Sequence, residues 1–130
     1  MVPDPLLSML FDFVRSIGIP VELKSLEAET FLPGLDIRHG TVLIDPDRLL
    51  YPGDILHEAG HIAVASSEER SYPSLTPTAG DEIATLAWSW AAVVHLDLPP
   101  EVLFHPAGYK GGSAALIERS EEHTSELQSH

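Results

Sequence analysis

Two histidines and a glutamate interrupt an apolar stretch near the middle of this 130-residue chain. The stretch reads DILHEAGHIAVA and covers residues 54–65. If it forms a helix, His57 and His61 are one turn apart and point from the same face toward a single point. Two imidazoles in that arrangement suit a Zn²⁺ ion, and Glu58, on a neighbouring face, could deprotonate a metal-activated water.

The pattern H-E-x-x-H on a helix is a signature of zinc peptidases. Apolar residues at helical spacing predict a helix from about residue 55 to residue 65, with Asp54 as its N-cap. Gly60 lowers helix propensity, but a small residue there would let another segment approach closely. The alternative interpretation is that both histidines are satisfied by partners in an ordinary core, since unpaired buried polar groups are costly.

A catalytic zinc site needs a third protein ligand. The nearest candidates are Asp81 and Glu82, in the first turn of a long predicted helix, while His95 and His105 are more distant. Only one of the two carboxylates can face the first helix. We expect Glu82 to be the ligand, because it aligns with a mostly apolar stripe through Leu86, Trp90 or Ser89, and Val93. Asp81 is then expected to cap its helix or to support a ligand.

The remaining pattern predicts an α+β fold, in which a small antiparallel sheet packs against three or four helices. Residues 3–18 show the spacing of an amphipathic helix, and residues 19–26 alternate as a half-buried strand does. Residues 35–45 predict two short strands with His39 and Gly40 at the turn. A polar loop at residues 66–78 precedes the long helix of residues 79–98, and Pro100 can start a short helical turn.

Composition excludes several classes of protein. The chain carries 7 basic and 20 acidic residues, a net charge of −13, which disfavours binding to nucleic acid or to an anionic membrane surface. It has no cysteine, so neither a disulfide nor a thiolate metal site can form. No apolar run is long enough to span a bilayer, and the first residues lack the basic start of a signal peptide. These observations predict a cytoplasmic protein, and its oligomeric state is left open. A peptide or protein substrate is what the H-E-x-x-H motif predicts.

The segments HEAGH and DEIATLAWSWAA together resemble the gluzincin-type metallopeptidases, in particular the compact ImmA/IrrE-type domains. The resemblance covers roughly residues 19–96. It implies a zincin-like metalloprotease fold, Zn²⁺ held by two histidines and a carboxylate that matches Glu82, and a general base that matches Glu58. It also implies that an edge strand before the motif helix pairs with an extended substrate, and the segment TVLID at residues 41–45 is the expected strand.

The sequence therefore predicts a zinc-dependent metallopeptidase that hydrolyses a peptide bond. His105 and Tyr109, in the loop after the long helix, are candidate catalytic donors to the carbonyl oxygen. The alternative is a non-catalytic metal-binding domain with a regulatory or interaction role that retains the same helix.

The last twelve residues, RSEEHTSELQSH, share no pattern with the rest of the chain. They resemble the conceptual translation of a sequencing adapter. We therefore expect one domain over residues 1–118, truncated at its C-terminus, followed by a non-native tail over residues 119–130.

Overall fold

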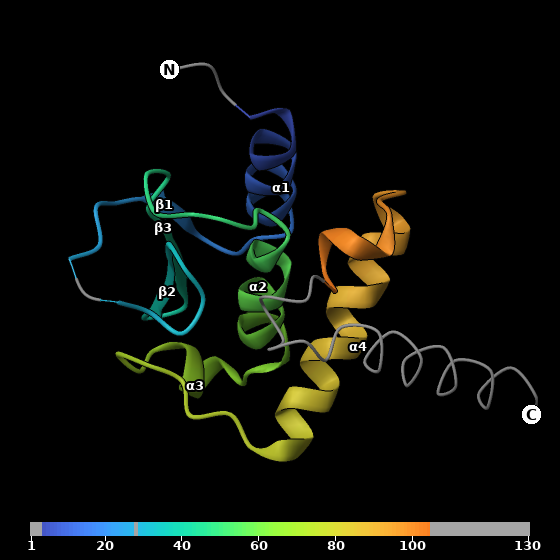
Figure 1. Ribbon diagram of the computed structural model, residues 1–130. Coiled ribbons are helices and arrows are strands. Elements are labelled where there is room, and N and C mark those ends of the chain that lie inside the picture. Colours follow the sequence, from blue (N-terminus) through green and yellow to red (C-terminus); the bar gives the residue numbers. More distant parts are fainter. Residues whose placement is uncertain (1–3, 28, 105–130) are drawn as a thin grey trace, which may run out of the picture.

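The computed structural model describes residues 4–27 and 29–104, and these residues form a small α+β fold (Figure 1). The elements in chain order are α1 (Pro5–Ser16), β1 (Val21–Leu23), β2 (Leu35–Arg38), β3 (Thr41–Ile44), α2 (Asp54–Val64), α3 (Ser67–Arg70), α4 (Ala79–His95) and the short 3-10 helix η1 (Pro100–Val102). The expected fold class, the hairpin turn at His39 and Gly40, and the helical turn beginning at Pro100 are all confirmed.

The three strands are arranged in the order β1-β3-β2, and the sheet is mixed, not antiparallel as the sequence predicted. Strands β2 and β3 form the expected antiparallel hairpin, whereas β1 pairs in parallel with β3, with Val21 opposite Val42. Strands β1 and β2, which follow each other in the chain, lie at opposite edges of the sheet, with β3 between them. Segment 41–45 therefore provides the central strand, and the expectation that it is an edge strand is wrong: β1 and β2 are the edges.

The core forms where α2 lies between the sheet and α4, as Figure 1 shows. One side of α2 contacts α1 and the strands, and the other side contacts α4. Ile44, Ile55 and Leu56 are completely buried at the centre of this arrangement. Because much of α2 is buried, polar side chains such as Asp54 and His61 are surrounded by protein rather than by solvent.

The start of α2 differs from the expected one. Its N-cap is Gly53, and Asp54 is instead the first helical residue, with only 1% of its surface exposed. A Cβ atom built on Gly53 would lie 1.7 Å from the carbonyl oxygen of Val102 in η1. The chain after α4 thus packs directly on the backbone of the α2 N-terminus, and this contact requires a residue without a side chain.

Helix α4 begins with a capping box. The Thr78 hydroxyl accepts a hydrogen bond from the Asp81 backbone N–H at 3.1 Å, and the Asp81 carboxylate accepts one from the Thr78 N–H at 2.9 Å. This confirms the expected capping role of Asp81. No helix in the described ranges has both the length and the apolar character needed to cross a membrane.

We predict that Gly53→Ala destabilises the fold by about 2–4 kcal/mol, because the new methyl group overlaps the Val102 carbonyl and α2 must separate from η1. Urea denaturation measures the loss. Gly80→Ala is the matched control, since the nearest atom to its Cβ, the Thr78 Oγ1, lies 3.8 Å away. That control should leave stability unchanged or slightly raised. Equal stability of the two variants would contradict the close packing at Gly53.

Candidate metal centre

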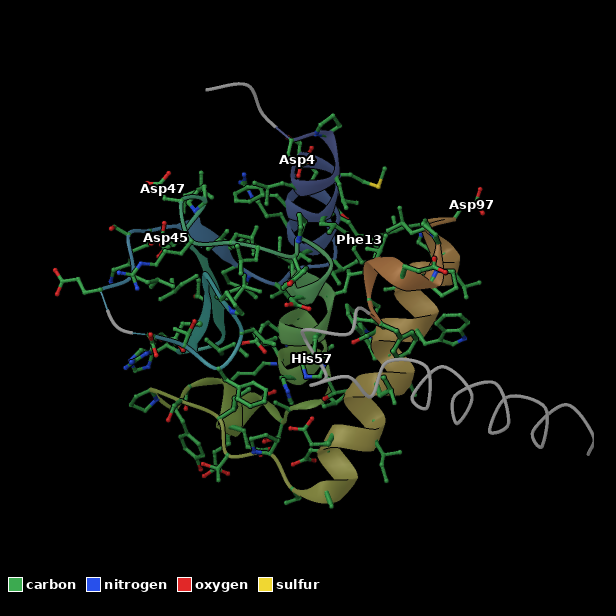
Figure 2. The ribbon with its side chains drawn as sticks, in the orientation of Figure 1. Asp4, Phe13, Asp45, Asp47, His57 and Asp97 are labelled. Atoms are coloured by element: carbon green, nitrogen blue, oxygen red, sulfur yellow. The ribbon has the colours of Figure 1, made fainter. Side chains whose placement is uncertain are left out.

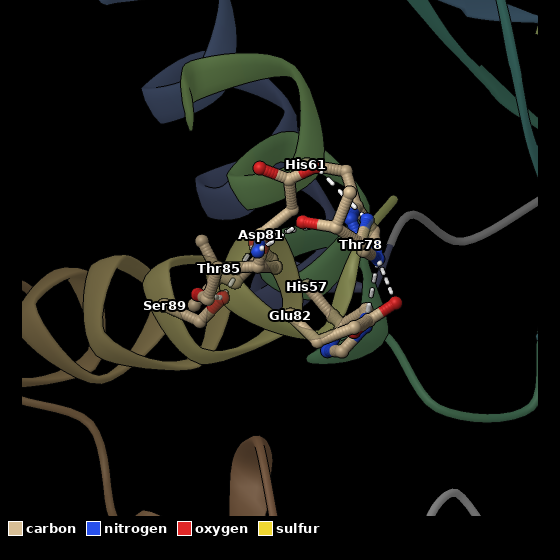
Figure 3. A network of polar contacts seen from close by, with 8 residues as sticks. His57, His61, Thr78, Asp81, Glu82, Thr85 and Ser89 are labelled. Carbon is tan, nitrogen blue, oxygen red and sulfur yellow. Dashed lines mark hydrogen bonds and ion pairs between the residues drawn. The ribbon is translucent and has the colours of Figure 1, made fainter. Parts of the chain in front are cut away.

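His57, His61 and Glu82 converge at the contact between α2 and α4 (Figure 3). The two Nε2 atoms are 3.1 Å apart. The Glu82 carboxylate lies 3.6 Å from the Nε2 of His61 and 3.9 Å from that of His57. Of the residues that the structure describes, these three form the one cluster of metal-ligating side chains.

These separations fit a tetrahedral metal ion. Ligand atoms about 2.0–2.1 Å from a tetrahedral Zn²⁺ ion are about 3.3 Å from one another. The Nε2 pair at 3.1 Å and the 3.6 Å from the His61 Nε2 to the Oε1 of Glu82 are close to that value, while the 3.9 Å distance from the His57 Nε2 goes to the other oxygen, Oε2. With one atom from each residue, the three lie within 4.8 Å of one another. The same three residues were predicted as ligands from the sequence, and the geometry brings all three together. A fourth position is then left for water or substrate.

Buried surroundings keep both imidazoles uncharged. Burial and, to a smaller extent, the neighbouring His61 lower the pKa of His57 to about 4. Burial also lowers the pKa of His61, against the opposing influence of Glu82 and Asp81. A metal ion binds the neutral imidazole, so at neutral pH these side chains need to lose no proton before they bind it.

A buried hydroxyl of α4 supports His61. The Thr85 Oγ1 atom lies 3.3 Å from the Nδ1 of His61, and Thr85 has no exposed surface. Because this contact engages Nδ1, it leaves Nε2 directed at His57 and Glu82. Ser89, one turn further along, donates to the carbonyl oxygens of Leu56 at 3.1 Å and Thr85 at 2.7 Å. Figure 3 shows this network along α4.

The face of α4 that contacts α2 matches the predicted stripe in part: Ser89 and Val93 are buried as expected, whereas Leu86 and Trp90 are only partly buried. Its other buried residues are Thr85 and Ala92. Gly60 explains the difference: a Cβ there would lie 2.9 Å from the Ser89 Oγ and 3.0 Å from the Thr85 Cγ2. The expectation that this glycine permits a close approach is confirmed. Thr85 is the hydroxyl residue that periodicity missed, since an apolar pattern gives a small polar residue no weight.

Glu58 lies in the same cleft as the three candidate ligands. The cleft has a volume of about 580 Å³ and is lined by Glu58, the triad, residues of β2 and the loop before α4. Burial raises the pKa of Glu58 to about 8, and the negative charges of Asp54, Asp36 and Glu82 contribute. A carboxyl group with that pKa can both accept and release a proton near neutral pH.

The other sequence candidates lie apart from the triad or outside the description. His95, near the end of α4, packs against Phe13, with ring centroids 5.9 Å apart. His39 is exposed at the hairpin turn, as expected, with a φ of 49°. His105, Tyr109 and the tail at residues 119–130 lie outside the described residues. Figure 2 shows His57 on α2, near the loop that follows α3 and the start of α4.

Comparison of the chain with protein-family models, with curated proteins and with solved structures finds no match.

We predict that Glu58→Gln changes how the stability of the metal-free protein depends on pH. Between about pH 6.5 and 8 the folded state retains the proton on Glu58 while the unfolded state has lost it, so the parent loses stability as pH rises. The loss attributable to Glu58 is about 2 kcal/mol over this window. The glutamine variant lacks that loss. Urea denaturation of both proteins with a chelator present, at several pH values, measures the difference; parallel curves would contradict the raised pKa.

Proposed function

We propose that this chain is a zinc-dependent metallopeptidase, in which His57, His61 and Glu82 bind the zinc ion and Glu58 is the general base. The observation that carries the proposal is the convergence of two imidazole nitrogens and one carboxylate at 3.1–3.9 Å from one another. Their resemblance to the gluzincin ligand set, and the presence of Glu58 in the same cleft, are further support.

When bound, Zn²⁺ supplies a Lewis acid that polarises the substrate carbonyl and makes water easier to deprotonate. Glu58 would then perform the proton transfers: its carboxylate takes a proton from the attacking water and passes that proton to the amine that leaves. Burial and the surrounding negative charges favour the protonated form of Glu58, which makes it a strong base once ionised. A divalent cation nearby lowers this pKa, so the ionised form is available at neutral pH.

Strand β2 is the edge strand that an extended substrate would use. Asp36 and Ile37 of β2 line the cleft, and β2 pairs with β3 on its other side. The Ile37 N–H donates to the Asp36 carboxylate at 2.8 Å rather than to β3. A substrate carbonyl can replace that carboxylate, because the Asp36 side chain can rotate away, and the substrate backbone would then extend the sheet.

We predict that the purified chain binds about one zinc ion and that His61→Ala and Glu82→Ala each weaken binding by more than about 100-fold, since each removes a ligand atom. Elemental analysis gives the stoichiometry, and competition with a chelator gives the affinity. Asp81→Asn is the control, because Asp81 caps α4 and is not among the converging ligand atoms. Retention of zinc by Glu82→Ala together with its loss in Asp81→Asn would assign the third ligand to Asp81.

We predict that Glu58→Gln retains zinc but lowers kcat for peptide hydrolysis by about 10²- to 10⁴-fold, because an amide cannot accept the proton from water. A mixture of unstructured peptides, incubated with the zinc-loaded proteins and read by mass spectrometry, provides the assay. If the zinc-loaded parent and the variant are equally inactive, the domain is a non-catalytic metal-binding module instead.

A further inference from the structure

Phe31 stands at the rim of the cleft that contains the three candidate ligands, with 85% of its surface exposed. It is the most exposed large hydrophobic residue in the described part of the chain. An isolated surface hydrophobe needs no explanation, but this one borders a concave site where polar groups converge. Phe31 is therefore placed to contact a molecule that binds in the cleft.

The backbone that follows Phe31 packs against the rest of the protein. The Thr30 hydroxyl donates to the Leu32 carbonyl oxygen at 2.5 Å, across Phe31, and Leu32 itself is only 6% exposed. Two residues further along, Gly34 has a φ of +76° and packs against the backbone of Leu49, where a Cβ would lie 2.4 Å from the Leu49 nitrogen. The loop is thus anchored on the C-terminal side of the exposed ring.

The cleft continues from Phe31 as an apolar wall. Leu32 and Ile37 contribute from the β2 side, and Leu75 and Pro77 contribute from the loop before α4. The polar lining is concentrated on the two helices, where His57, Glu58, His61 and Glu82 lie. A substrate bound over the helices would therefore have apolar surface beside its reacting bond.

We propose that Phe31, together with Leu32, Ile37 and Leu75, forms a specificity subsite for an aromatic or large aliphatic side chain of the substrate, on the residue next to the scissile bond. This inference rests on the proposed peptidase function and adds the class of substrate to it. An apolar side chain in this position removes both its own surface and the Phe31 ring from water, which favours the complex. Continuity with the metal centre is the reason to assign this wall to substrate rather than to a second copy of the chain.

The test compares two small hydroxamates that chelate zinc, those of N-acetylphenylalanine and N-acetylalanine, on the zinc-loaded full chain. Binding is measured by calorimetry, so the result does not depend on turnover. We expect the phenylalanine compound to bind about 10-fold more tightly to the parent, and we expect Phe31→Ala to reduce this preference to about 2-fold or less. Leu50→Ala is the matched control, because Leu50 is another exposed hydrophobic residue, with 65% of its surface exposed, and it does not line the cleft. It should leave the preference unchanged.

Equal affinity of the two compounds for the parent, or a preference that survives in Phe31→Ala, would overturn the subsite while leaving zinc binding intact. A lower unfolding temperature for Phe31→Ala than for Leu50→Ala would also overturn it, because the ring would then pack against the protein itself. Failure of the parent to take up zinc would instead refute the proposed function, and the subsite with it.

Discussion

The approach of α4 to α2 at Gly60 is the contact on which the geometry of the candidate centre depends. Because Gly60 has no side chain, Thr85 and Ser89 lie against the backbone of α2, where a Cβ would be within about 3 Å of both. The two hydroxyls then serve as polar links between the helices: one contacts a histidine ring and the other a carbonyl of the preceding turn. The same approach sets how far Glu82 is from the histidines. The packing of the two helices therefore also determines the geometry of the site.

Burial at this contact also determines the charge of the centre. Two imidazoles with lowered pKa values and a glutamate with a raised one all favour their neutral forms in the absence of a cation. The fold thereby avoids the cost of isolated buried charges. It keeps nitrogen lone pairs directed at one point, and the half-exposed Glu82 supplies negative charge from the solvent side. Such a site is organised before any ion arrives, which reduces the reorganisation that binding requires.

Local pattern was sufficient for much of this architecture. Helical spacing, the residues at the hairpin turn, and the position of His57, Glu58 and His61 could all be predicted from neighbouring residues. The capping role of Asp81 was also accessible, because Asp81 stands three residues after Thr78, in the position of a capping box, and Glu82 is the carboxylate that lies near the histidines. Contacts between residues far apart in the chain could not be predicted in this way. The parallel pairing of β1 joins Val21 to Val42, which is far along the chain, and the start of α2 at Gly53 depends on η1, which is farther still from α2 in sequence.

The division of the candidate ligands between two helices bears on the dynamics of the segment between them. His61 lies in the last turn of α2, Glu82 lies in the first turn of α4, and the segment between the two helices contains α3. An ion bound by both would act as a crosslink that closes this loop, much as a disulfide would in a chain that has no cysteine. Opening of the first turn of α4 would then require release of the ion, so occupancy would slow amide hydrogen exchange across residues 66–82. The state of the metal centre could thus be read from backbone protection along this whole segment, including α3, which does not line the cleft.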